Sequence, residues 1–363
     1  MLGQRLAEAR ELAEMTQEGL ARAVHLERTA IGLLERGERN LRVTELINIA
    51  RVLGRPLSFF TEPPIPAVVS RRRAPHTAHE STQQMDAELQ QFAFDVRALA
   101  QLGLLDAVER SIGAHVPRTV VEAESAAARF RRQLDDPTGP MADLGAACEA
   151  FGLFTFAAEL GKNGPDGGCV EVEVSNGSLG VAVINGDADP GRRRMTLAHE
   201  LGHWLFGDAY DVETSSDNES MINAFAIHFL APRSGVVAVW KSHDEDDYGR
   251  ALAVAATFRL SWSAAVAHLR NVDLITHQQH DALARQEPRR GDFLARNLVW
   301  QQELTAPSLS PGFLAACMRG VATGALTSAR ALELTRGVIA VDDLPETEPA
   351  SLHDIRRAFE GHA

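Results

Sequence analysis

The sequence predicts a multi-domain protein in which an all-α N-terminal domain is followed by an α+β domain and a mostly helical C-terminal segment. Its 363 residues exceed the roughly 100–200 residues of a usual single domain. Helical periodicity, broken by short polar turns, fills residues 2–60. Residues 170–174 and 179–184 instead alternate and are rich in β-branched side chains, which is typical of strands. Helical patterns resume at residue 194.

The composition excludes several classes of protein. A composition of 45% apolar and 23% charged residues is typical of a globular protein, and the sequence contains no apolar run long enough for a membrane span. Charged residues run through the first fifteen positions, which argues against a secretory signal and predicts a cytoplasmic protein. The widely spaced Cys148, Cys169 and Cys317 predict packed, reduced thiols rather than disulfides or a cysteine-based zinc site.

The net charge is unevenly distributed along the chain. The whole sequence carries −13, which argues against a protein that coats nucleic acid over its entire surface. Residues 1–80 hold twelve Arg and ten Glu, a net charge of +2, so the other 283 residues carry −15. Only the N-terminal part therefore has the charge balance of a DNA-binding domain.

Changes in composition predict where the domains begin and end. The expected segments are an N-terminal domain over 1–62, a linker over 63–83, connector helices over 84–136, an α+β domain over 137–275, and a helical region of unknown role over 276–363. The linker is rich in Pro, Ser, Thr and His, and its Arg71-Arg72-Arg73 run is either solvated or a phosphate-contacting arm. Asn176-Gly177 lies between the two strand-like runs and predicts a β-hairpin.

The N-terminal domain contains a pattern of helix, tight turn and helix. Residues 16–23 form the first predicted helix, 24–27 the turn, and 28–36 the second helix. This arrangement places the second helix in the major groove of DNA. The stretch TQEGLARAVHLERTAIGLLERGERN, followed by LINIARVLG, resembles the Cro/CI-type (XRE) helix-turn-helix family over about residues 2–60. The resemblance implies binding to double-stranded DNA.

The resemblance also implies roles for single residues at the DNA. Gln17 is expected to hold phosphate and brace the recognition helix, and an Arg at that helix's start can contact guanine with roughly 1–3 kcal/mol of discrimination. The residues expected at base edges are Arg28, Thr29 and Gly32, and those expected near the DNA backbone are Arg36, Arg39 and Asn40.

The turn departs from the family pattern because His25 stands where Gly is usual. A left-handed backbone there is costly for a residue with a side chain. Glu27 and Glu38 also weaken the local positive potential. A helical module that only dimerises remains the alternative interpretation of this domain.

The chemistry lies in residues 196–208, TLAHELGHWLFGD. His199 and His203 are four residues apart in a helical sequence, so they project from one face and can ligate one metal ion. Glu200 lies beside them, and HExxH on a helix suits zinc with the Glu as general base. Gly202 permits close approach of another backbone. A structural helix with two surface histidines is the alternative.

A catalytic zinc site takes three protein ligands and leaves one position open. After a polar loop, ESMINAFAIHFLAP begins a second helix with Glu219 in its first turn. AHELGH followed by ExxxNxFAxxxLxP resembles the ImmA/IrrE family of metallopeptidases over about residues 137–275. The resemblance implies a zincin-like fold, zinc-dependent endopeptidase activity, Glu219 as third ligand, and Asn223 steadying a ligand.

Several residues near these motifs have more than one possible role. Ile222 stands where the family generally has Ala, and His228 is expected to be a packed core histidine. The alternatives for the third ligand are Asp208, Glu213 and Asp217, and the possible oxyanion donors are Tyr210, His243 and Tyr248. The run Arg192-Arg193-Arg194 is expected to mark a solvated edge.

Together these features predict a bacterial or phage-type regulator that joins DNA binding to zinc-dependent proteolysis. Glu200 takes a proton from water and passes it to the leaving amine. Relatives of this family often cleave a repressor, which implies derepression of a stress, prophage or toxin-linked operon. A homodimer on an inverted repeat is expected. The alternatives are a transcription factor or antitoxin-like protein whose peptidase fold is a sensor with little proteolysis, and self-cleavage within 63–83.

Overall fold

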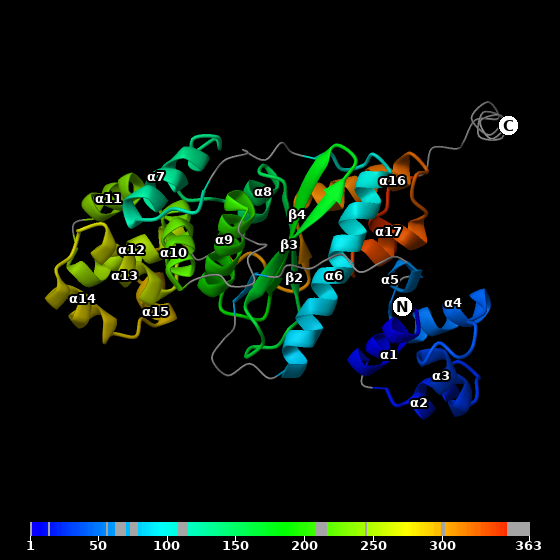
Figure 1. Ribbon diagram of the computed structural model, residues 1–363. Coiled ribbons are helices and arrows are strands. Elements are labelled where there is room, and N and C mark those ends of the chain that lie inside the picture. The colour runs from blue at the N-terminus through cyan, green and yellow to red at the C-terminus, as the bar shows by residue number, and fades with distance from the viewer. Residues whose placement is uncertain are drawn as a thin grey trace.

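The structure is a computed structural model that describes residues 2–13, 15–55, 57–61, 70–72, 79–107, 115–207, 216–243, 245–298 and 302–346. An all-α N-terminal domain lies beside a mixed sheet that has helices on both faces, and further helices form a lobe at one side of the sheet (Figure 1). The predicted fold class, a multi-domain protein with a helical N-terminal domain and an α+β domain, is confirmed.

The N-terminal domain packs short helices around a small apolar core. Its helices are α1 (Leu2–Leu12), α2 (Gln17–Ala23), α3 (Arg28–Glu35), α4 (Val43–Val52) and α5 (Leu57–Thr61). Thr16 caps the N-terminus of α2, because its hydroxyl accepts a hydrogen bond from the backbone N–H of Gly19 at 3.0 Å. Leu20, Ile31 and Phe59 are completely buried in the core that joins the helices.

Within the residues that the structure describes, the sheet has five strands in the order β1-β3-β4-β2-β5. The strands are β1 (Ser70–Arg72), β2 (Leu153–Ala158), β3 (Gly167–Val174), β4 (Gly177–Asn185) and β5 (Ser308–Leu309). Only β2 and β4 are parallel; the other neighbours are antiparallel. The predicted hairpin is confirmed, since Val174 pairs with Gly177 across the turn. The two edge strands come from the predicted linker and the C-terminal region.

Alternating side chains give the sheet two apolar faces, as the pleat of a strand requires. On β4, Val181 and Val183 point to one face, whereas Ala182 and Ile184 point to the other. The first face is covered by α6 (His79–Gln101), α16 (Pro311–Ala322) and α17 (Ser328–Leu334). The second is covered by α8 (Leu144–Glu149) and α9 (Pro190–Phe206), and Figure 1 shows α6 and α9 on opposite sides of the strands.

A helical lobe extends the second face. Its helices are α7 (Val120–Arg131), α10 (Ser216–Leu230), α11 (Arg233–Ser242), α12 (Asp247–Phe258), α13 (Trp262–Asn271), α14 (His277–Ala284) and α15 (Arg290–Leu294). A short 3-10 helix outside this lobe, Val341–Asp343, follows α17. In this lobe α10 packs against both α9 and α7. The two predicted connector helices therefore pack differently, since α6 covers the sheet and α7 supports α10.

The expectation of a solvated edge at residues 192–194 is wrong for two of the three arginines. Arg193 and Arg194 are buried, with 4% and 1% of their surface exposed. Arg193 donates to the Gly186 carbonyl at 2.7 Å, and Arg194 forms an ion pair with Glu303. The start of α9 is packed inside the protein, so each of these guanidinium groups is buried and has a polar partner there, although some of their nitrogens remain without a hydrogen bond.

The predicted buried thiols are confirmed, because Cys148, Cys169 and Cys317 are free and buried. Across the described ranges, no single helix is long and apolar enough to cross a membrane; two bent helix pairs reach that length and hydropathy only when taken together.

The N-terminal domain contacts the helix that covers the sheet. The Arg5 guanidinium lies 4.2 Å from the ring centre of Phe59 within its own domain. It also lies 5.9 Å from the ring centre of Phe94 on α6 and donates to Gln90 at 3.2 Å. A cation–π contact and a hydrogen bond therefore connect the two parts at this point.

Candidate metal centre and DNA-binding surface

The candidate metal centre lies where α9 and α10 cross at Gly202. A Cβ atom on Gly202 would lie 3.0 Å from Ile222 Cγ2 and 3.1 Å from Phe225 Cδ1, which is closer than ordinary packing. The missing side chain lets α10 approach, and Ile222 is fully buried in the contact. The bulkier residue at 222 is thus accommodated against a glycine. This crossing brings the first turn of α10 over the two histidines of α9.

Three side chains converge at this crossing. The Nε2 atoms of His199 and His203 are 2.9 Å apart. The Glu219 carboxylate lies 3.3 Å from the first of them and 3.4 Å from the second. Both histidines are fully buried, whereas 38% of the Glu219 side chain is exposed. The pKa of the Glu219 carboxyl is held well below its ordinary value, because the group lies at hydrogen-bonding distance from both imidazoles.

Asn223 fixes the protonation of one of these histidines. Its amide nitrogen donates to the backbone carbonyl of Glu219 at 2.8 Å, so its oxygen is the atom that faces His199 Nδ1 at 3.2 Å. That oxygen can only accept, so Nδ1 carries the hydrogen and Nε2 presents its lone pair. Two imidazole nitrogens and a carboxylate within 4.8 Å of one another match the ligands that zinc prefers. The residues present therefore fit a metal ion.

Glu200 lies beside this cluster, on the side of α9 that faces the sheet. The residue is fully buried, and neither carboxylate oxygen has a hydrogen-bond partner of ordinary geometry. Burial raises the pKa of Glu200; the charges of His199 and His203 and the nearby thiol of Cys169, a weak donor, partly offset this. A carboxyl group in this setting binds a proton more readily than a solvated one.

The other predicted residues lie outside the cluster or outside the described ranges. Asp217 is exposed on α10, while Asp208, Tyr210 and Glu213 belong to residues the structure does not describe. Tyr248 donates to Asp292 at 3.1 Å, and His243 contacts the carbonyl of Val239 at 3.0 Å. The two described candidates for the oxyanion donor are therefore engaged with residues outside the cluster.

Two features were missed in the sequence. The exposed His277 and the half-buried His280 and Asp281 form a group on α14 whose ligand atoms are also close enough to hold a metal, and the HxxHD spacing could have revealed it. A cleft of about 820 Å³ lies beside the metal cluster, between α7, α9, α10 and α13. Its lining residues are far apart in sequence, so no local pattern could have indicated it.

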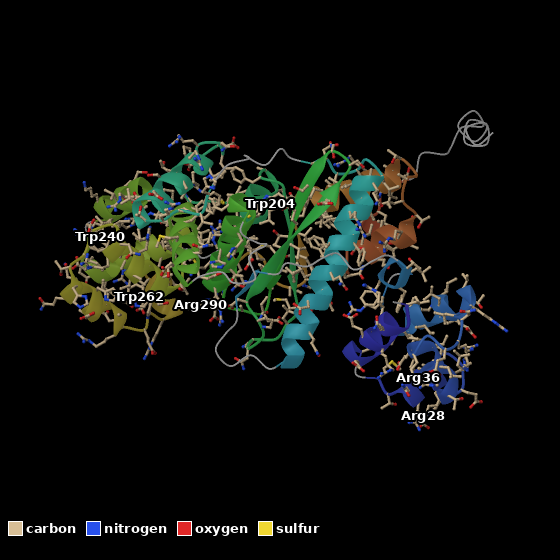
Figure 2. The ribbon with its side chains drawn as sticks, in the orientation of Figure 1. Arg28, Arg36, Trp204, Trp240, Trp262 and Arg290 are labelled. Atoms are coloured by element: carbon tan, nitrogen blue, oxygen red, sulfur yellow. The ribbon has the colours of Figure 1, made fainter. Side chains whose placement is uncertain are left out.

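The predicted DNA-binding residues lie on and around α3. Arg28 and Thr29 are exposed at its start, and Figure 2 shows Arg28 and Arg36 on the part of the domain that faces away from the sheet. His25 has a φ of 56°, so the turn does adopt the left-handed backbone conformation at this non-glycine residue. Gly32 differs from the expectation because it is buried; a Cβ there would lie 3.4 Å from Arg36 Nη1 and 3.7 Å from the side-chain oxygen of Gln17.

Acidic neighbours engage several of these polar groups. Gln17 donates to Glu35 at 2.7 Å, which ties α2 to α3. Arg36 pairs with Glu38 at 3.1 Å, and the half-buried Arg39 pairs with Glu45 at 2.6 Å. Asn40 is exposed. Arg28 and Thr29 are therefore the predicted base-contacting side chains that the domain presents at its surface.

Two comparisons with known families match separate parts of the chain. Residues 6–60 match the family model described as helix-turn-helix. Residues 148–270 match the family described as the IrrE N-terminal-like domain, and this segment contains α9 and α10 with all three clustered side chains. No curated protein and no solved structure gives a significant match.

Proposed function

The chain joins an XRE-type helix-turn-helix domain to a metallopeptidase-like domain of the ImmA/IrrE type, and on this premise we propose that it is a transcriptional regulator with a zinc-dependent endopeptidase activity. The helix-turn-helix domain implies DNA binding, and the second domain implies a metal ion and a protein substrate. The proposed substrate is a repressor or another regulatory protein of a stress, prophage or toxin-linked response. Residues 1–62 and 137–275 are the proposed DNA-binding and peptidase units.

The observation that supports proteolysis is the convergence of His199, His203 and Glu219, in which His199 presents an unprotonated nitrogen. We assign the metal to these three residues. Zinc bound there supplies a Lewis acid that polarises the substrate carbonyl and lowers the pKa of water. Glu200 then accepts a proton from the attacking water and delivers it to the leaving amine. Asn223 keeps His199 in the tautomer that binds the metal.

Zinc content tests the ligand assignment. The wild-type chain purified without chelator is expected to hold about one zinc ion, because a catalytic site needs three protein ligands. Glu219→Ala should weaken binding strongly, whereas Asp217→Ala, two residues earlier on the exposed side of the same helix, should keep the ion. Elemental analysis of both variants shows which of Glu219 and Asp217 is needed to bind zinc. Equal zinc in wild type and Glu219→Ala, or loss only in Asp217→Ala, would contradict the assignment.

The substrate is sought among regulatory proteins encoded beside this gene. Each is incubated with the zinc-loaded chain, and fragments are identified by mass spectrometry, with a chelator-treated sample as control. A cleaved partner is expected to lose its regulatory function. Intact partners together with cleavage of the chain itself within residues 63–83 would favour self-processing.

The DNA-binding surface is proposed to read an inverted repeat as a homodimer, with one α3 helix per half-site. Arg28→Ala is expected to relax sequence preference by about 1–3 kcal/mol, because an arginine at the start of the recognition helix reads a base edge. Arg36→Ala should weaken specific and scrambled DNA alike, since a phosphate contact carries no sequence information. Binding titrations on both DNAs measure this. The same loss on both DNAs for Arg28→Ala would refute its role.

A sensor with little proteolysis is the second candidate. His199, Glu200 and His203 have no exposed surface in the described structure, and Glu219 is the member of the site that solvent reaches. A buried centre of this kind suits metal or ligand sensing as well as catalysis. Cleavage of a protein that requires Glu200 would support the endopeptidase function, and its absence would support the sensor function.

A further inference from the structure

Strand β1 is a piece of the predicted linker that lies along one edge of the sheet. Its residues, Ser70–Arg72, fall between the two segments that match known families, and they pair antiparallel with β3. In the described part of the chain β1 is the end strand of the sheet on this side. It also contacts α9, the helix that carries the two clustered histidines. A segment that precedes the peptidase-like domain is therefore packed against the helix of the candidate metal centre.

The β3 residues that pair with β1 face α9. A Cβ atom on Gly167 would lie 2.6 Å from Thr196 Cγ2, so strand and helix are in close contact at this point. Two residues further along β3, the thiol of Cys169 lies beside the Glu200 carboxyl. The register sets Ser70 directly opposite Cys169. Because neighbouring strands are about 4.8 Å apart, the backbone of β1 is one strand spacing from the residue that touches the proposed general base.

The order of side chains around α9 places the two histidines on the side of β1. Successive helix residues are rotated by about 100°, so a circuit of the middle of α9 meets in turn Trp204, Glu200, Thr196, His203, His199 and Gly202. Trp204 packs against β4, because a Cβ atom on Gly180 would lie 2.7 Å from its ring. The next two side chains face β3, and Gly202 meets α10. The histidines therefore point between β3 and α10, and β1 is the next strand beyond β3 in that direction.

The backbone of β3 offers its hydrogen-bonding groups to β1 at alternate residues. At the start of this strand, the Asn185 N–H donates to the directly opposite Asp166 carbonyl at 2.8 Å, so this pair is a hydrogen-bonded one. Hydrogen-bonded pairs alternate along an antiparallel ladder. Gly168 therefore bonds to β4, whereas Gly167 and Cys169 direct their N–H and C=O groups away from β4 and toward β1.

Only alternate residues of β1 bond to β3 in return. Ser70 and Arg72 stand opposite the two residues that face them, so their backbone groups make the hydrogen bonds. Arg71 stands between these positions, and its N–H points away from β3. Strand β1 has 3 residues, whereas β3 has 8. A longer extended peptide can make more backbone hydrogen bonds along this edge than β1 does, and can replace it.

We propose that β1 is an autoinhibitory strand: residues 70–72 occupy the edge of β3 that an extended segment of a protein substrate must use, and the substrate reaches the metal centre only after β1 is displaced. This inference rests on the proposed endopeptidase function. A strand paired with this edge passes beside the two histidines, so β1 and a substrate strand exclude each other. The rate of cleavage by the wild-type chain is then set by the fraction of molecules from which β1 has detached.

Two proline variants test this assignment, and each removes one arginine from the linker. Arg72→Pro removes an N–H that points to β3, whereas Arg71→Pro removes one that points away, which an edge strand tolerates. In the zinc-loaded full chain, hydrogen exchange at the Gly167 and Cys169 amides should be about 10-fold faster in Arg72→Pro than in wild type or Arg71→Pro, because one hydrogen-bonded pair is lost. Zinc content and unfolding temperature should be the same in all three chains.

The same three chains are then incubated with a proteome-derived peptide mixture, with a chelator-treated sample as control. Arg72→Pro should generate new termini about 10-fold faster than wild type, and Arg71→Pro should match wild type. Faster exchange without faster cleavage, equal behaviour of the two proline variants, or cutting of the wild-type chain within residues 70–72 overturns the proposal and leaves proteolysis standing.

A binding measurement covers the case in which no zinc-loaded chain cleaves anything and the proposed endopeptidase function fails. A fluorescein-labelled synthetic peptide of residues 66–74 is titrated with each chain, and its anisotropy reports binding at the edge of β3. About 10-fold tighter binding to Arg72→Pro than to Arg71→Pro supports β1 as the displaceable occupant of a peptide-binding edge. Equal binding to the two variants, or none to either, overturns it.

Discussion

Replacing Glu200 with Gln is expected to separate the two activities of the chain. Gln has nearly the same shape, and Glu200 lies outside the three clustered ligand side chains, so zinc content and DNA binding should persist. Gln cannot accept the proton, and loss of a positioned general base costs a factor of about 100–10,000 in rate. The regulated operon should therefore remain uninduced under the inducing stress, as measured with a reporter fused to its promoter.

Cells carrying wild type and cells carrying the variant must contain equal amounts of protein, because a buried Glu-to-Gln change can alter stability. Normal induction by a zinc-loaded Glu200→Gln chain would show that proteolysis is not the signal. The sensor function would then take its place.

Replacing His203 with Ala is expected to remove the metal and lower stability. The residue is fully buried, and two of the three clustered ligand side chains would remain. Ligands that bind only the folded state stabilise it, by about 4 kcal/mol when present at a thousand times Kd. The variant should therefore hold no zinc and unfold at a lower temperature, close to that of the metal-free wild type.

His277→Ala is the matched control for this experiment, because His277 belongs to the second histidine group and is 81% exposed. Elemental analysis and thermal unfolding should find it equal to wild type. Zinc retained by His203→Ala and lost by His277→Ala would assign the ion to the group on α14.

The parts of the fold that the sequence predicted depend on short-range patterns. The hairpin follows from two alternating runs around Asn176-Gly177, and the pairing of Val174 with Gly177 confirms it. The spacing of His199 and His203 on one helix is likewise local, so their approach to 2.9 Å could be expected. Glu219 could be named only through the family resemblance, because its position depends on how α10 crosses α9.

The features that could not be predicted depend on contacts between distant segments. Strand β1 falls in a stretch without apolar periodicity and is set by its antiparallel pairing with β3. The charge of Arg194 indicated solvent, yet its partner Glu303 is more than a hundred residues away. Gly32 was expected at base edges, and the side chains of Gln17 and Arg36 cover it. His268 gave no signal because the ring that it packs against, that of His228, belongs to another helix.

The most direct test of the central claim, that this chain is a zinc endopeptidase whose base is Glu200, is a cleavage measurement at equal zinc occupancy. Wild type and Glu200→Gln, each shown by elemental analysis to hold about one zinc per chain, are incubated with the same protein and peptide mixture, and new termini are counted by mass spectrometry over time. Wild type should generate new termini that a chelator abolishes, and the variant should generate them about 100–10,000 times more slowly. No new termini from zinc-loaded wild type, or equal rates from both chains, would contradict the claim.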